Sequence, residues 1–150
     1  MTNITKKQLI LILALLILTP VIFLLASPLV LSKTIDEEIG EKASFETLSQ
    51  GMFTGADSSH KASGSAYILQ SNNGSRFLRL ESFQTTNGPD LYIYLASDTG
   101  ASDFVNLGRL KANIGNQTYT IPSDVDISNY EYTLIWCKAF SVLFGNAKLN

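Results

Sequence analysis

The sequence predicts a small all-β domain, an antiparallel β-sandwich, preceded by one N-terminal transmembrane helix. Two observations predict this fold class. A single uncharged apolar run lies near the N-terminus, and the chain then changes to short runs of strand-forming residues separated by turn residues. Turn signals at intervals of about 8–12 residues are typical of sandwiches and barrels. The chain has 150 residues, so the part after the apolar run is long enough for one domain with a single core.

The apolar run extends from Leu9 to Leu31 and contains no charged residue. As a helix it would span about 34 Å, slightly more than the ~30 Å hydrocarbon core of a bilayer. Lys6 and Lys7 precede the run, and the acidic residues 36–38 follow it. Positive charge favours the cytoplasmic side. We therefore expect residues 1–8 in the cytoplasm, a single-pass anchor at 9–31 in the cell membrane, and an extracytoplasmic C-terminal domain.

A cleaved signal peptide is the alternative interpretation of the same run. Its basic start fits, but the run is longer than the usual apolar region of about 7–15 residues, and no Ala-x-Ala cleavage site follows it. Both interpretations export the domain.

Residues 32–43 are polar and acidic, so we expect a short linker there and a folded domain at 44–150. The domain contains seven predicted strands, and Asn72-Asn73-Gly74 supplies a hairpin turn between the first two. Residues rich in β-branched and aromatic side chains, or alternating in polarity, define these strands. They lie at 65–70, 76–81, 91–95, 104–110, 117–121, 132–137 and 140–144.

Composition and motifs exclude several classes of function. From Lys33 onward the chain has nine basic and thirteen acidic side chains, a formal charge of −4 with no basic stripe, so we expect no nucleic-acid partner. One cysteine cannot form an internal disulfide. The sequence has no Gly-x-Ser-x-Gly motif and no glycine-rich phosphate loop, so nothing supports a hydrolase or a stand-alone nucleotide-dependent enzyme.

Four stretches in order along residues 45–149 resemble the DM13 domain family. They are Gly51-Met52-Phe53 with His60, Ser63 and Gly64; Leu78–Phe83 running into Asn87–Leu91, Tyr94 and Leu95; Leu107–Lys111 with Gly115–Gln117, Tyr119 and Pro122; and Ile135–Lys138 with Phe140–Val142, Phe144, Gly145 and Ala147.

This resemblance implies a β-rich extracytoplasmic domain, often attached to a membrane, with a role in electron transfer. It also implies that the cysteine, here Cys137, is the redox residue, either as a bare thiol or as the ligand of a prosthetic group such as haem. His60 is the only histidine, so it is the candidate second ligand and assisting residue.

Each of these two residues also has a simpler structural interpretation. Cys137 can be a small apolar side chain in the core, and His60 can be a loop residue that hydrogen-bonds a turn. In a strand, Ile135 and Cys137 share one face while Leu134 and Trp136 share the other, and either face can be the core. A c-type haem, a blue-copper centre and a structural zinc site are excluded, because one cysteine and one histidine do not supply their ligands.

Two functional hypotheses follow from the sequence. The first is a membrane-tethered redox domain centred on Cys137, with a redox protein as its partner. The second is a non-catalytic binding or adhesion module that presents its six tyrosines to a cell-surface protein. An exposed Cys137 near His60 favours the first hypothesis, and a buried one favours the second. Arg79 and Glu81 lie on one strand face, where we expect a surface ion pair.

Overall fold

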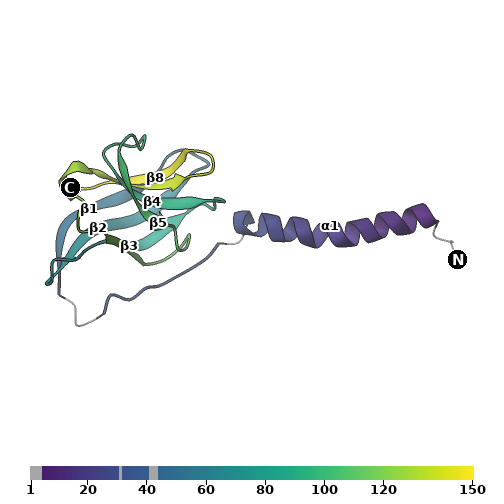
Figure 1. Cartoon of the computed structure of the whole chain (residues 1–150), viewed down its shortest axis with the longest axis horizontal. Coiled ribbons are helices and arrows are strands. Elements are labelled where there is room, and N and C mark those ends of the chain that lie inside the picture. The colour runs from purple at the N-terminus through teal and green to yellow at the C-terminus, as the bar shows by residue number, and fades with distance from the viewer. Residues whose placement is uncertain (1–4, 31, 41–43) are drawn as a thin grey trace.

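The computed structural model describes residues 5–30, 32–40 and 44–150. It confirms the predicted fold class, since one N-terminal apolar helix precedes a sandwich-like domain of eight antiparallel strands. Figure 1 shows the helix extending from one end of the domain, and a strand-free segment running along the domain before the first strand begins.

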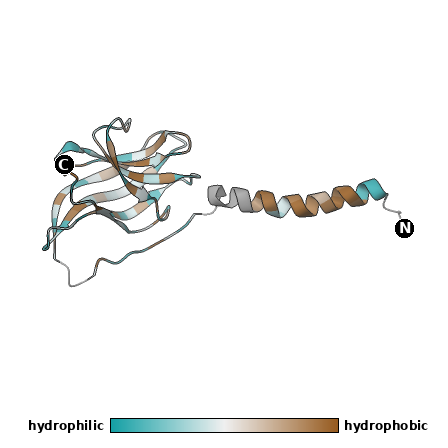
Figure 2. Ribbon diagram, viewed as in Figure 1, coloured by the Kyte–Doolittle hydropathy of each residue, from teal (hydrophilic) through white to brown (hydrophobic). Residues whose placement is uncertain are grey.

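Helix α1 (Lys6–Val30) begins at a capping box. The Thr5 hydroxyl accepts a hydrogen bond from the Gln8 amide at 3.3 Å, and the Gln8 side chain accepts one from the Thr5 amide at 2.9 Å. Figure 2 shows a polar start followed by mostly hydrophobic residues along the coloured part of the helix. The apolar side chains from Leu9 to Phe23 are exposed, and the helix is long and apolar enough to cross a membrane, a property that a signal sequence shares. Leu31 lies outside the described residues.

The strand order across the sheet is β5-β4-β7-β8-β1-β2-β3-β6, and every pairing of neighbours is antiparallel. The bounds are β1 (Phe45–Gly55), β2 (Ala62–Ser71), β3 (Arg76–Thr85), β4 (Leu91–Ala96), β5 (Phe104–Arg109), β6 (Gln117–Ile121), β7 (Tyr132–Cys137) and β8 (Val142–Lys148).

Strand β1 belongs to both layers of the sandwich. Its first part, to Met52, pairs with β2, whereas Phe53–Gly55 pairs with β8. The crossing requires close backbone approach at Gly51, where an added Cβ would lie 2.1 Å from the Lys148 carbonyl oxygen. The outermost strands β5 and β6 contact each other, so the sheet nearly closes into a barrel.

The main core fills the space between the two layers. Its members alternate along the strands, as side chains on one face of a pleated strand must. The buried residues of this core are Phe53, Ala66, Ile68, Leu78, Leu80, Phe83, Leu91, Ile93, Leu95, Tyr119, Ile121, Ile135, Cys137, Phe144 and Ala147. The inner face of β7, which the sequence leaves open, is thus the one that carries Ile135 and Cys137, while Leu134 belongs to a second cluster on the outer face.

All seven predicted strands are present, with several boundaries shifted: β2 begins three residues earlier than predicted, and β3 ends four residues later. The last strand begins at Val142 rather than at Phe140, which lies in the preceding turn, and it continues through Gly145 to Lys148. Strand β1 was not predicted. Its burial alternates from Ser49 to Gly55, but the less exposed positions are mostly serine and glycine, whereas Leu48 and Met52 are exposed, so the sequence shows no alternation in polarity.

Residues 32–40, expected as part of the linker, lie against the domain. We call this segment the strap. The amide of Ile35 donates to the Ile114 carbonyl and that of Glu37 to the Asn116 carbonyl, both at 3.0 Å. The strap passes so close to Gly115 (φ +105°) that a Cβ there would lie 1.8 Å from the Ile35 carbonyl oxygen. The chain therefore leaves the helix and is fixed to the domain within a few residues.

We expect Leu80→Ala to destabilise the domain by about 2–5 kcal/mol, because Leu80 is fully buried in the core and its truncation leaves a cavity. Leu48→Ala is the matched control. Leu48 is 38% exposed on β1, so the same change should cost less than about 1 kcal/mol. Urea unfolding of the full chain in detergent, followed by fluorescence of the single tryptophan Trp136, measures both. Equal costs would contradict the assignment of Leu80 to the core.

Candidate functional site

Cys137 is the last residue of β7 and points into the main core. It pairs with Leu91 on one side and Val142 on the other, and none of its surface is exposed. The thiol is free. A thiol needs access to exchange with a partner. In this conformation the Cys137 thiol has no such access, and the side chain packs as an apolar core residue.

The cation beside Cys137 in the sequence faces elsewhere. The Lys138 ammonium lies 5.4 Å from the centre of the Tyr92 ring on the outer side of the sheet, and the Lys138 amide donates to the Asp90 carbonyl at 2.9 Å. The turn that follows, residues 138–141, is fully exposed and contains Ser141 at φ 53°. Cys137 is therefore the last residue of its strand, and an exposed turn follows it directly in the chain.

His60 closes the loop between β1 and β2. Asp57 accepts hydrogen bonds from the amides of Ser59 and His60 at 2.7 and 2.8 Å, and its second oxygen lies 2.7 Å from His60 Nδ1. The hydrogen bond from the His60 side chain, followed by those from the two amides, lowers the pKa of Asp57 to about 2. These are the contacts of a loop histidine that stabilises a turn.

His60 and Cys137 lie at the same end of the domain but are not in hydrogen-bond contact within the described residues. The His60 ring packs on Phe144, with 4.4 Å between ring centres, and Phe144 belongs to the same core as Cys137. A haem held by both residues would require the sulfur and the imidazole to face a common slot. The sulfur is enclosed, and the imidazole is held by Asp57 and covered by Phe144, so haem does not fit this conformation.

A groove of about 750 Å³ opens beside the His60 loop. It is lined mostly by polar groups of the strap, the His60 loop and strand β3, namely Ser32, Gly55, Asp57, Lys61, Ala62, Ser63, Gln84, Thr85, Thr86 and Asn87. Within the described residues no three His, Cys, Asp or Glu side chains are grouped so that they could hold a metal ion. The groove thus offers hydrogen-bond partners rather than a metal centre.

The outer face of β4, β5 and β7 carries an aromatic cluster. Tyr94 stacks on Phe104 with 4.3 Å between ring centres, and Trp136 and Tyr92 each lie 6.4 Å from Tyr94. Arg109 and Lys138 approach the Tyr92 ring at 6.0 and 5.4 Å, distances at which a cation is attracted to an aromatic face. Aromatic side chains from three strands are thus gathered into one partly exposed surface.

Glu37 fixes the strap to the domain. Its carboxylate accepts hydrogen bonds from the Lys111 ammonium at 2.8 and 3.0 Å and from the Thr118 amide at 2.8 Å, and its carbonyl accepts one from Arg79 at 2.6 Å. Burial by itself would raise the pKa of Glu37, but these hydrogen bonds and the charges of Lys111 and Arg79 outweigh burial and lower it. Glu37 therefore stays ionised against the domain.

The surface position expected for Arg79 is wrong. Its side chain is 5% exposed, and the ion pair with Glu81, 3.4 Å long, is its longest polar contact. Thr118 and the Glu37 carbonyl satisfy the guanidinium, because the strap covers it. In the sequence, the acidic run after the apolar segment is the feature that could have indicated this buried contact of Arg79. That run by itself is also typical of a solvated linker.

Comparison with known proteins identifies one family. A family model described as "Electron transfer DM13" matches residues 52–149, which include both His60 and Cys137. No curated protein matches the chain significantly, and neither does any solved structure.

We expect His60→Ala to raise the pKa of Asp57 from about 2 toward the ordinary 3.8, because the His60 side chain is the largest cause of the lowered value. Carboxyl carbon NMR across an acid titration measures this pKa. Asp98 is the control, since its pKa is lowered chiefly by the Ser102 hydroxyl and should not change. An unchanged Asp57 would mean that the backbone amides alone hold the carboxylate.

We expect Glu37→Gln to loosen the strap, because a neutral amide loses the charge-assisted bonds to Lys111. Amide hydrogen exchange of Ile35 and Glu37, whose N–H groups donate across the strap, should become several-fold faster. Glu131→Gln is the matched control, because Glu131 pairs with Lys148 in an exposed contact at 3.6 Å. If both variants change strap exchange equally, the Glu37 contact is not what holds the strap.

Proposed function

Because this chain belongs to the DM13 family, we propose that it is a membrane-tethered electron-transfer domain outside the cytoplasm, with Cys137 as its redox centre and His60 as the assisting residue. The observation that carries the proposal is the family match, whose description is electron transfer and whose span contains both residues. The proposed division of the chain is a cytoplasmic end at 1–8, an anchor at 9–31, a connection at 32–43 and the domain at 44–150.

The charges on either side of helix α1 support this orientation. Lys6 and Lys7 stand at its start, and Asp36, Glu37 and Glu38 follow it, the distribution expected of a helix whose N-terminus stays in the cytoplasm. The length of the apolar run supports an uncleaved anchor, because the uncharged run from Leu9 to Leu31 is longer than the apolar region of about 7–15 residues that a signal peptide usually has.

A single thiol sets the stoichiometry of the proposed reaction. Oxidation of two thiols to a disulfide releases two electrons and two protons, and this chain supplies one thiol. The partner must therefore present a disulfide: the Cys137 thiolate attacks one of its sulfurs, the partner's S–S bond breaks, and the mixed disulfide forms as the other sulfur leaves as a thiolate, so the partner's disulfide is the oxidant. No bound metal or haem is needed for this step.

Access to Cys137 requires a local opening rather than unfolding. Cys137 ends β7, and the exposed turn 138–141 follows it directly in the chain. Strand ends and turns open at lower free energy than the centre of a sheet. His60, oriented by Asp57 at the same end of the domain, is the imidazole available to take up the thiol proton.

Thiol labelling tests the proposal. A disulfide reagent added to the native full chain in nanodiscs should modify Cys137 at a rate set by local opening. The control is the double variant Cys137→Ser/Ile135→Cys. Ile135 lies on the same face of β7, is equally buried, and sits in mid-strand between Ile93 of β4 and Gly145 of β8. We expect Cys137 to react at least about tenfold faster, equivalent to an opening free energy lower by about 1.4 kcal/mol. Equal rates would reject thiol exchange in the native domain.

The second candidate function is a non-catalytic binding module, and the complete burial of Cys137 favours it. Its contact surface would be the aromatic cluster, where Tyr92, Phe104 and Trp136 are partly exposed beside Arg109 and Lys138. Exposed aromatic and arginine side chains are enriched at protein interfaces. A Cys137 as inert as the mid-strand control would make this module the working account.

A further inference from the structure

We propose that the helix-proximal end of the domain rests on the lipid surface, with Phe140 inserted at the interface and lysines facing anionic headgroups. This inference rests on the part of the proposed function that makes helix α1 a membrane anchor. The helix-proximal end consists of the strap start at 32–33, the loops 56–61 and 86–90, and the turn 138–141.

The short connection between helix and strap brings this end to the membrane. Helix α1 ends at Val30, and the Lys33 carbonyl already accepts hydrogen bonds from the amides of Asn113 and Ile114 at 2.9 and 3.1 Å. Three residue steps reach at most about 11 Å. With the apolar run embedded in the bilayer, Lys33 and the surface that holds it cannot move far from the headgroups.

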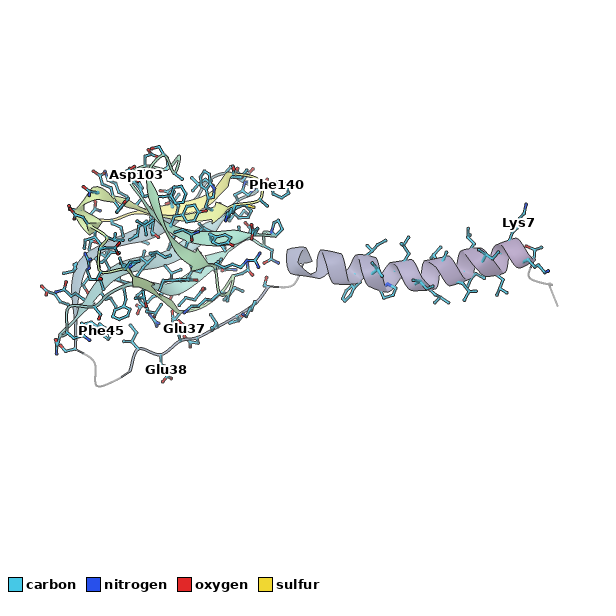
Figure 3. The ribbon with its side chains drawn as sticks, viewed as in Figure 1. Lys7, Glu37, Glu38, Phe45, Asp103 and Phe140 are labelled. Atoms are coloured by element: carbon cyan, nitrogen blue, oxygen red, sulfur yellow. The ribbon has the colours of Figure 1, made fainter. Side chains whose placement is uncertain are left out.

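Phe140 lies on this same end. Lys33 lines a groove with Gly88 and Pro89, and the Asp90 carbonyl accepts the Lys138 amide that begins the turn of Phe140. Figure 3 shows Phe140 on the side of the domain from which the helix extends. Its side chain is 70% exposed. Aromatic side chains at the level of the headgroups anchor proteins to the interface.

The charge of this end complements an anionic membrane. Lys33, Lys61 and Lys138 are exposed here, against the carboxylates of Asp57 and Asp90. Arg109 of β5 adjoins this end, because it pairs with Asp90 and lines a groove with Lys33, and we count it with the three lysines. The remainder of the chain from Lys33 onward carries five basic and eleven acidic side chains. The excess of positive charge therefore sits on the one end that the anchor brings to the lipid, where cations are attracted within about 10 Å of the surface.

Docking would place the strand end that carries Cys137 at the membrane. The turn 138–141 follows Cys137 directly in the chain. Contact of Phe140 with lipid therefore orients this strand end toward membrane-bound partners. The same contact points the far hairpin, at 72–75, and the C-terminus away from the bilayer. Strands β1 and β2 run the length of the domain and separate this hairpin from the helix-proximal end.

Paramagnetic broadening in nanodiscs tests the proposal. The full chain is reconstituted with anionic lipid and a trace of gadolinium-chelating lipid, and amide signals are compared between the turn 138–141 and the far hairpin 72–75. We expect strong attenuation only at the turn. The tether alone could produce part of this difference, so the decisive variant is Phe140→Ser, which should reduce attenuation of the turn at least twofold.

Met52→Ser is the matched control, because Met52 is 77% exposed and lies within β1, away from the proposed contact. It should leave the attenuation unchanged. No effect of Phe140→Ser would overturn the insertion of Phe140, and attenuation independent of anionic lipid would overturn the role given to the lysines. Since the reconstituted chain retains its helix, either failure is distinct from failure of the anchor, which intact mass of the chain isolated from cell membranes tests separately.

Discussion

The docking of the strap constrains how everything else in this protein is presented. A solvated linker between the helix and β1 would let the domain tumble above a membrane. Instead, backbone hydrogen bonds at Ile35 and Glu37 hold the connection against residues 113–118. A fixed connection limits how far the domain can move relative to the helix. If the helix is the proposed anchor, one end of the domain then lies close to the bilayer, and hydrogen bonds within the domain, together with the helix, set that orientation.

Strand β7 divides the chemistry of the domain between two faces. Its inner face places Cys137 in a close-packed core, and its outer face places Trp136 among tyrosines and cations. A redox role uses the inner face and requires motion, whereas a binding role uses the outer face and requires none. The two functions make opposite demands on the turn after Cys137, since thiol exchange needs it to open and an interface gains from its rigidity.

The sequence predicts the sandwich well because seven strands carry their own alternation or β-branched composition. It does not predict β1, whose polar side chains reflect its position at the junction of two layers. Nor can it decide which face of β7 is buried, because Ile135 and Leu134 are equally apolar and only the packing of neighbouring strands distinguishes them. The role of Arg79 depends on the strap, and acidic residues after an apolar run look alike whether they are solvated or bound to a buried arginine.

Ionisation of Glu37 links the strap to pH. Its pKa is lowered in the folded chain because the contacts with Lys111, Thr118 and Arg79 outweigh the effect of burial. A lowered carboxyl pKa contributes stability that is present above the ordinary value of 4.5 and is lost as the pH falls through the lowered value. The strap should therefore hold at neutral pH and loosen only in acid below that value. Release would leave fourteen residues, 31–44, between Val30 and the first strand, and these would no longer hold the domain close to helix α1. In the proposed anchored arrangement, the orientation at the membrane therefore depends on a charge contact, which the helix by itself does not provide.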